Sequence, residues 1–122
     1  MIKSKLKQIL PSLREKKRYL VFEVISEQKI VESELVSNAV LHHFSEFVGN
    51  LGCAKSGLII LNNKWNPELQ KGVIKINNKH VDALKASLTF IDKIDNKQVI
   101  FRSIGLSGIL NKAERKFLKS AS

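Results

Sequence analysis

Residues 10–24 read LPSLREKKRYLVFEV, and they join a basic run directly to an apolar stretch. Residues 18–25 are rich in β-branched and aromatic side chains, which predicts a β-strand. Because alternate residues of a strand face opposite sides of its sheet, Phe22 should lie on one face and Tyr19 on the other. The cations at the entrance to this strand are Arg14, Lys16, Lys17 and Arg18. So much positive charge beside a buried strand suggests that this end of the sheet faces a polyanion.

The later segments alternate between helical and strand patterns. Apolar residues recur at helical spacing over 33–48 and again over 79–92. The apolar seam of the second helix is Val81, Leu84, Leu88 and Ile91. Strands are expected over 53–62, 72–76 and 97–104, and a final helix over 109–118.

The order β-α-β-β-α-β predicts an α+β fold, the ferredoxin-like, RRM-like split βαβ sandwich. In this plan a four-stranded antiparallel sheet carries two helices on one face. Both faces of the strands are apolar, as at Leu58 and Ile59, so the second face also needs a cover. We expect the terminal helices to lie on or near that face, with a partner protein covering part of it. The expected organisation is a single α/β sandwich domain over 1–122, with a basic N-terminal arm or helix over 1–17 and a basic C-terminal helix over 109–119.

The net charge is +10, and it is distributed unevenly. Residues 1–18 carry a net charge of +6, residues 19–53 carry −4, and residues 54–122 carry +8. Basic ends with an acidic segment between them favour a protein with one face on a polyanion and another turned away. The alternative is generic solubilising charge, which many small basic proteins carry.

Other classes are disfavoured by the composition. No apolar run approaches the ~20 residues that a spanning helix needs, so no membrane association is expected. The first ten residues lack the apolar stretch of a secretory signal. The single cysteine, Cys53, excludes an internal disulfide and is interpreted as a packed thiol. We therefore expect a cytoplasmic protein.

The side chains that could carry chemistry do not converge, so no catalytic and no metal-binding residues are expected. His42 and His43 are adjacent, and on a helix they would point about 100° apart, which prevents them from holding one metal ion. We interpret them and His80 as ordinary surface or helix-end histidines. Asp92 and Asp95 could share a cation, but an exposed helix end explains them equally well.

Two glycine-containing motifs are candidates for a phosphate site. GNLGCAKS (49–56) is not a P-loop, because Ala54 stands where Walker A needs glycine and because the segment joins a helix to a strand. Its glycines indicate a helix end and a turn. GLSGIL (105–110) joins a strand to a helix, so it could hold a phosphate at the helix start, or it could be a plain turn with Ser107 as N-cap. The two interpretations of GLSGIL remain open.

Base stacking on the sheet is not expected. An RRM stacks bases on aromatic residues of its central strands, and the third strand here, KGVIKI, has none. Tyr19 and Phe22 lie on opposite faces of the first strand. The remaining mode is contact between basic side chains and the backbone of a folded RNA.

Four segments carry a family resemblance: LPSLREKKRYLVFEV, FVGNLGCAKSGLIIL, KGVIKINNKHVDALKASLTFI and RSIGLSGILNKAERKFL. In this order, and over about residues 10–118, the chain resembles the archaeal branch of the ribonuclease P protein component 2 family. Lys75 stands where the family more often has arginine, and Ile109 where a threonine is common. The resemblance implies an α/β sandwich similar to an RRM but without its aromatic motifs.

The resemblance also implies a function. The family's holoenzyme is an endoribonuclease that removes the 5′ leader of precursor tRNA, with catalysis by the RNA subunit and Mg²⁺ bound to that RNA. The chain itself would bind no cofactor. Its implied partners are ribonuclease P RNA, precursor tRNA in the holoenzyme, protein component 3, and a second copy of the chain within a heterotetramer.

We therefore predict a noncatalytic RNA-binding subunit of ribonuclease P. The RNA-binding residues expected are Arg14, Lys16, Lys17, Arg18, Lys75, Lys79, Ser107, Lys112, Arg115 and Lys116. One alternative is a general RNA-binding or ribosome-associated protein of the same fold. Another is a ferredoxin-like regulatory domain that binds a small ligand at a dimer interface.

Overall fold

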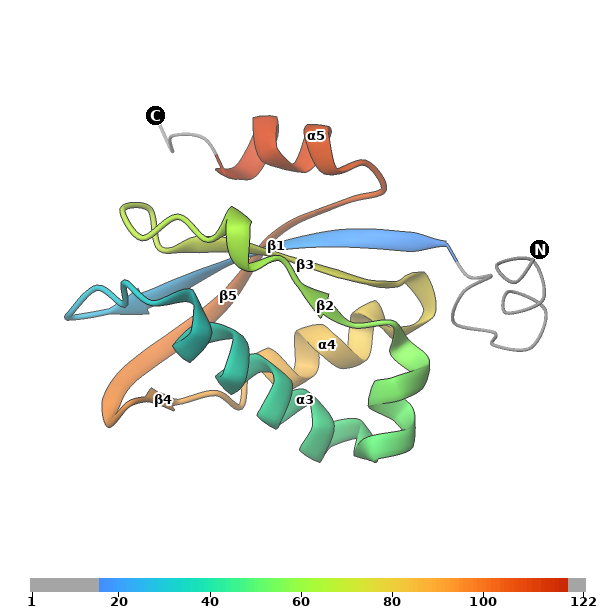
Figure 1. Ribbon diagram of the computed structural model, residues 1–122, viewed down its shortest axis with the longest axis horizontal. Coiled ribbons are helices and arrows are strands. Elements are labelled where there is room, and N and C mark those ends of the chain that lie inside the picture. Colours follow the sequence, from blue (N-terminus) through green and yellow to red (C-terminus); the bar gives the residue numbers. More distant parts are fainter. Residues whose placement is uncertain (1–15, 119–122) are drawn as a thin grey trace.

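Residues 16–118 are described by a computed structural model (Figure 1). The basic arm predicted over residues 1–17, including Arg14, therefore lies almost wholly outside the described residues. The strands are β1 (Lys17–Ser26), β2 (Ile59–Ile60), β3 (Lys71–Asn77), β4 (Lys93–Ile94) and β5 (Lys97–Ser107). The α-helices are α3 (Ser33–Ser56), α4 (Val81–Leu88) and α5 (Leu110–Ala113). Short 3-10 turns form η1 (Asn62–Lys64) and η2 (Asn78–His80), and a π-helical turn forms η3 (Glu114–Leu118).

The strands form one antiparallel sheet in the order β2-β3-β1-β5-β4. The predicted α+β class with an antiparallel sheet is confirmed, but the sheet has five strands where four were expected. The extra strand, β4, pairs with the first residues of β5 across a tight turn at Asp95 and Asn96. Both turn residues have positive φ, 52° and 65°, as a two-residue hairpin requires.

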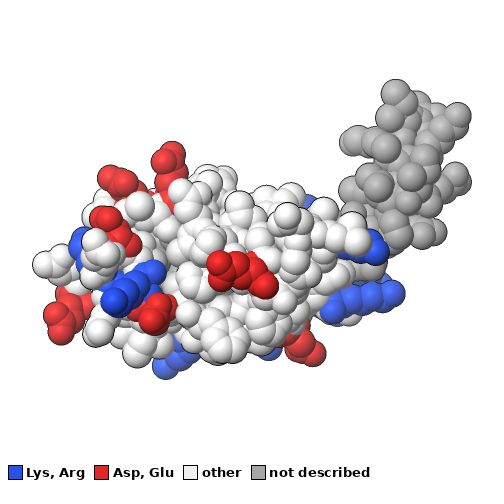
Figure 2. Space-filling model, turned by 90° about the horizontal axis from the view of Figure 1, so that it is seen from below, with Lys and Arg blue, Asp and Glu red and all other residues white. Residues whose placement is uncertain are grey.

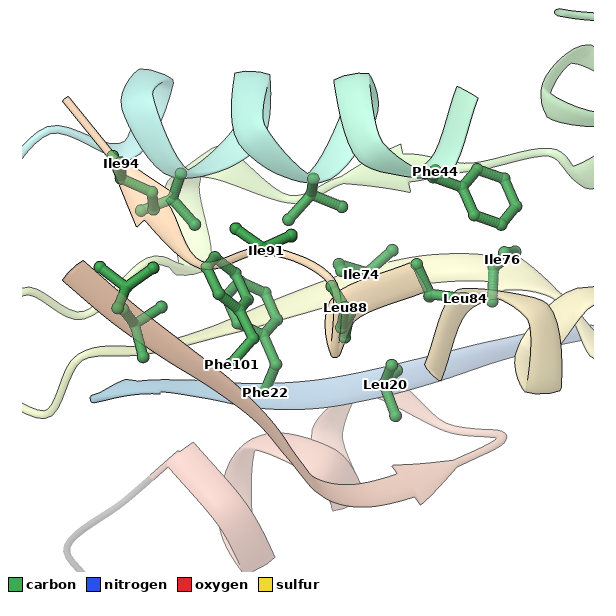
Figure 3. Close-up of a cluster of buried hydrophobic side chains, with 14 of the residues drawn as sticks. Leu20, Phe22, Phe44, Ile74, Ile76, Leu84, Leu88, Ile91, Ile94 and Phe101 are labelled. Atoms are coloured by element: carbon green, nitrogen blue, oxygen red, sulfur yellow. The ribbon is translucent and has the colours of Figure 1, made fainter. Parts of the chain in front are cut away.

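The main core lies between the sheet and the helices α3 and α4 (Figure 3). Phe22 stands at its centre, stacked between Trp65 and Phe101 at ring-centroid distances of 6.1 and 5.6 Å. The residues of the seam predicted for the second helix are all buried: Val81, Leu84, Leu88 and Ile91. The helix itself is shorter than predicted, because α4 ends at Leu88 and Ile91 lies beyond it. Strand β1 also follows its predicted alternation, because Leu20, Phe22 and Val24 all belong to this core.

The opposite face of the sheet is partly covered by α5 and η3. Val21 and Val73 are buried there with Ala113, and Phe117 packs against them. The ring of Phe117 lies over Gly105, where a Cβ would come within 2.2 Å of it. The sequence prediction that a C-terminal helix covers this face is therefore confirmed for the middle of the sheet.

The strand predicted over residues 53–62 is wrong in its first half. Helix α3 continues to Ser56, because the single non-helical residue Gly49 (φ 81°) kinks the helix without ending it. The helix ends at Gly57, whose φ of 68° is the left-handed conformation common after a helix. Strand β2 consequently keeps only two residues.

Within the described residues, none of the helices combines the length and the apolar character needed to cross a membrane.

Candidate nucleic-acid interface

Several chain segments meet at one end of the sheet, where β1 begins and β3 ends. The amide of Asn78 donates to the carbonyl of Lys16 at 2.7 Å, which holds η2 beside the start of β1. Tyr19 of β1 stands opposite Lys75 of β3 and, on its other side, opposite Ser107 of β5. We call this region the basic end. Its cations are Lys16, Lys17, Arg18, Lys55, Lys75 and Lys79.

The C-terminus of α3 is fastened to the basic end by a fully buried amide, Asn77. Its Nδ2 donates to the carbonyl of Lys55 at 3.1 Å, and its Oδ1 accepts a hydrogen bond from Nζ of Lys17. Gly57 allows this close approach, since a Cβ there would meet Oδ1 of Asn77 at 2.8 Å. Lys17 is therefore held in place by the fold in addition to carrying charge.

Arg18 bridges two of the strand ends. Its Nε donates to Oδ1 of Asn78 at 3.1 Å, on the β3 side. On the β5 side, Nη1 lies 3.0 Å from where a Cβ on residue 108 would stand, so Gly108 leaves the room that the guanidinium occupies. The guanidinium thus hydrogen-bonds to η2 and lies next to the turn after β5.

The other cations of the basic end are available for a ligand. Lys16, Lys55 and Lys79 are exposed and Lys75 is half-buried. None of these four amino groups forms an ion pair or hydrogen bond with another of the residues 16–118. Asp82, in the first turn of α4, is the acidic residue closest in sequence to Lys79. The cations nevertheless outnumber it, so this end carries a net positive charge.

Figure 2 shows Lys and Arg at both ends of the described part, whereas Asp and Glu lie mainly at the end away from the basic end, mixed with Lys and Arg. At that far end, a cleft of about 760 Å³ lies between the end of β1 and the β4–β5 hairpin. Its lining contains both positive and negative side chains, Lys93 and Lys97 together with Asp92 and Glu27. The charge of the described part is therefore polarised along the sheet.

Three predicted cations do not join the basic end. Lys112, Arg115 and Lys116 are exposed on α5 and η3, which run back over the middle of the sheet. Glu114 pairs with Lys64 at 2.5 Å, and the carbonyl of Phe117 accepts from Lys71 at 3.2 Å. These three residues therefore lie over the middle of the sheet, and their contact with RNA stays a prediction.

Ser107 is positioned at the basic end, but its hydroxyl is engaged in the turn. The Oγ accepts from the amide of Ile109 at 3.1 Å and donates to its carbonyl at 3.0 Å. Ile109, not Ser107, occupies the N-cap position of α5. The turn interpretation of residues 105–108 fits this geometry better than a preformed phosphate site.

Lys55 is a candidate that the sequence did not reveal. It was assigned to a strand, whereas it lies in the last turn of α3, exposed and next to Asn77. A basic residue in the last turn before a glycine is itself a helix-end signal. That signal, read together with Gly57, could have identified it.

Cys53 and His42, for which no catalytic or metal-binding role was expected, make local contacts within the fold. Cys53 packs against the main core and accepts a hydrogen bond from Oγ of Ser45 at 3.4 Å. His42 pairs with Glu46 at 3.0 Å on the exposed side of α3. Across residues 16–118, no group of three or more His, Cys, Asp and Glu side chains is placed to hold a metal ion.

An α+β sandwich whose exposed lysines gather at one end of the sheet is typical of proteins that bind nucleic acids through the phosphate backbone. Residues 18–118 match the model of the Rpp14/Pop5 family. The chain therefore belongs to the Rpp14/Pop5 family.

Curated relatives agree with this assignment. Ribonuclease P protein component 2 of Thermococcus kodakarensis is 34% identical over 117 residues, which cover 96% of this chain and 95% of the relative. The protein of the same name from Methanosarcina mazei is 34% identical over 114 residues, covering 93% and 94%. A chain in the cryo-EM structure of yeast ribonuclease MRP has a similar fold, with a TM-score of 0.59 at 12% identity, covering 86% of this chain and 87% of that one.

Proposed function

We propose that this chain is a noncatalytic protein subunit of ribonuclease P, the endoribonuclease that removes the 5′ leader from precursor tRNA. The observation that carries the proposal is the match to relatives named ribonuclease P protein component 2 over almost their full length. The catalytic RNA supplies the chemistry and holds the Mg²⁺ ions. The protein binds that RNA and, in the holoenzyme, supports binding of the precursor tRNA.

The basic end is the RNA-binding surface in this proposal. Lys16, Lys75 and Lys79 belong to the same end of the sheet, and their amino groups have no protein partner among residues 16–118. Ammonium groups at such positions neutralise phosphates and release the counterions that surround RNA. Their effect is to lower phosphate repulsion, so that the folded RNA closes around its metal ions at lower Mg²⁺ concentration.

The proposed protein partner, component 3, binds the outer side of the two core helices. Phe47 of α3 and Phe90, just after α4, are exposed by 48% and 63%, and their rings lie 5.9 Å apart. Leu51, one turn beyond Phe47 on α3, is exposed by 70%. Exposed aromatic pairs of this kind are common anchors of protein interfaces. A second copy of the chain would join the same assembly to give a heterotetramer.

Two finer assignments belong to the same proposal. Apart from β4, the order β2-β3-β1-β5 is that of the ferredoxin-like, RRM-like split βαβ plan, with β4 as an added edge strand. The single cysteine of the sequence favours a reducing compartment, and we place the protein in the cytoplasm.

The proposal is tested by reconstituting ribonuclease P from the catalytic RNA with a triple charge reversal, Lys16→Glu, Lys75→Glu and Lys79→Glu. This variant should lose the rescue of precursor-tRNA cleavage at low Mg²⁺. The matched control reverses Lys85, Lys93 and Lys97, which changes the net charge equally but away from the basic end. The control should rescue cleavage almost as well as the native chain.

The co-purifying RNA provides an independent test. Sequencing the RNA bound to the native protein should recover ribonuclease P RNA. Recovery of ribosomal RNA instead would favour a general RNA-binding protein of the same fold. Equal rescue by both triple variants would remove the basic end from the proposal while leaving membership in the assembly intact.

A further inference from the structure

Four side chains form a continuous row across the sheet at the basic end. Ile59 of β2 pairs with Lys75 of β3, Lys75 pairs with Tyr19 of β1, and Tyr19 pairs with Ser107 of β5. Directly paired residues point to the same face, so all four lie on the face that carries α5. We call this set the Tyr19 row.

The Tyr19 row lies where that face is not covered by α5. The helix buries Val21 and Val73, which are two residues further along β1 and β3, and Tyr19 packs only at the edge of this cluster. Figure 1 shows α5 above the middle of the sheet and the first part of β1 extending past it. Ile59 is 51% exposed, and Lys75 and Tyr19 are half-buried. The row is thus a partly apolar surface open to a ligand.

The chemistry of the Tyr19 row matches one unpaired nucleotide. The aromatic ring of Tyr19 offers a surface on which a base can stack. The exposed side chain of Ile59, two strands away on β2, extends the apolar part of the row. Lys75, between Ile59 and Tyr19, supplies a positive charge for the adjoining phosphate, and its amino group has no partner among the described residues. The charge of the whole basic end is complementary to the same ligand, whereas a purely apolar protein segment would leave these ammonium groups without counter-charge.

We propose that the Tyr19 row binds a single unpaired RNA nucleotide, with its base stacked on Tyr19 and its phosphate on Lys75. This inference rests on the proposed function and goes beyond it, because contacts to the RNA backbone alone involve no base. It also replaces the sequence expectation that the sheet stacks no base. An RRM uses two or three aromatic residues for this purpose; here one aromatic residue serves one base.

Two short probes separate stacking from charge. One is a fluorescein-labelled single-stranded oligoribonucleotide of mixed sequence, and the other is an oligomer of the same length and phosphate number in which every base is missing. Tyr19→Leu should weaken binding of the base-containing probe by about 5- to 150-fold, as expected for loss of one stacked base. It should leave binding of the base-free probe unchanged. Tyr19→Phe, which keeps the ring, should bind both probes as the native chain does.

A folding defect in Tyr19→Leu would weaken binding of both probes, so unchanged binding of the base-free probe excludes it. Lys75→Gln tests the phosphate contact separately. This variant should weaken binding of both probes to the same degree, because it removes a phosphate contact. A further readout is photo-crosslinking from 4-thiouridine in the base-containing probe, with the crosslinked peptide expected to contain Tyr19. Native affinity of Tyr19→Leu for the base-containing probe, or a crosslink confined to other strands, would overturn the proposal.

Failure of stacking on Tyr19 and failure of the proposed RNA-binding surface give different results. If Tyr19→Leu binds normally while the Lys16, Lys75 and Lys79 reversal is weakened, only the stacking inference is lost. If the reversal also leaves ribonuclease P RNA binding intact, the proposed RNA-binding surface itself is wrong. If Tyr19→Leu instead releases component 3 without affecting either probe, the row is a protein contact and the stacking inference is overturned.

Discussion

Nζ of Lys17 donates a hydrogen bond to Oδ1 of Asn77, an amide with no exposed surface. The same amide holds the last turn of α3 through the carbonyl of Lys55. Lys17 therefore joins three elements at the point where the chain enters the sheet. A cation that the sequence assigned only to phosphate binding also contributes to the stability of the fold.

The first prediction separates these two roles of Lys17. Lys17→Ala should lower the free energy of unfolding by about 1–3 kcal/mol, because it leaves the buried Oδ1 of Asn77 without its donor. Lys16→Ala removes an exposed neighbour of equal charge and should change the free energy by less than about 0.5 kcal/mol. Urea denaturation of both variants measures the difference. Equal stability of the two would show that the Lys17 contact contributes nothing.

The second prediction concerns the packing of η3 on the sheet. Gly105→Ala should destabilise the protein by about 1–3 kcal/mol, because its Cβ would stand 2.2 Å from the ring of Phe117 and force the ring away. Thermal unfolding followed by circular dichroism is the measurement. The cause is checked by repeating Gly105→Ala in a Phe117→Ala background, where the same change should cost little. An unchanged cost in that background would exclude the ring as the source of the strain.

Long periodic segments were predictable from the sequence, because one face of each is buried in the main core. Strand β1 and the seam of α4 are of this kind: their apolar residues at periods of two and 3.6 leave little choice of which side faces inward. Short elements depend on single residues instead. The β4–β5 hairpin was missed although Asp95 and Asn96 are residues that tolerate positive φ. Helix α3 was ended too early because the glycines of GNLG (49–52) were taken as its end.

The candidate site was less predictable than the fold. The Tyr19 row depends on the pairing register of four strands, and a sequence gives the face of a residue but not the residue opposite it. Lys55 belongs to the basic end only because α3 extends to Ser56. Conversely, Arg115 and Lys116 were grouped with the N-terminal cations on charge alone. The direction in which η3 runs over the sheet, fixed by the Phe117 and Lys71 contact, places them elsewhere.

A third prediction tests the protein-binding face. Phe47→Asp puts a charge beside Phe90 on an already exposed surface, so it should leave the fold intact but weaken association with component 3 at least tenfold. Val31→Asp alters a residue that is 67% exposed in a different region, and it should bind normally. Analytical ultracentrifugation of each variant mixed with component 3 gives the comparison. Loss of binding in both variants, or in neither, would contradict the assignment of this face.

The last prediction concerns the salt dependence of RNA binding. If each cation of the basic end neutralises one phosphate, about six contacts form, and log K should fall with log salt with a slope of roughly −4 to −5. Lys79→Gln removes one exposed ammonium group and should make the slope shallower by about one while weakening binding to all RNA sequences alike. Lys85→Gln, on the exposed side of α4, should leave the slope unchanged. Filter binding across a series of salt concentrations measures all three slopes. A slope near zero for the native chain would mean that charge does not hold the RNA, whereas a normal slope that Lys79→Gln leaves unchanged would place the phosphate contacts away from η2.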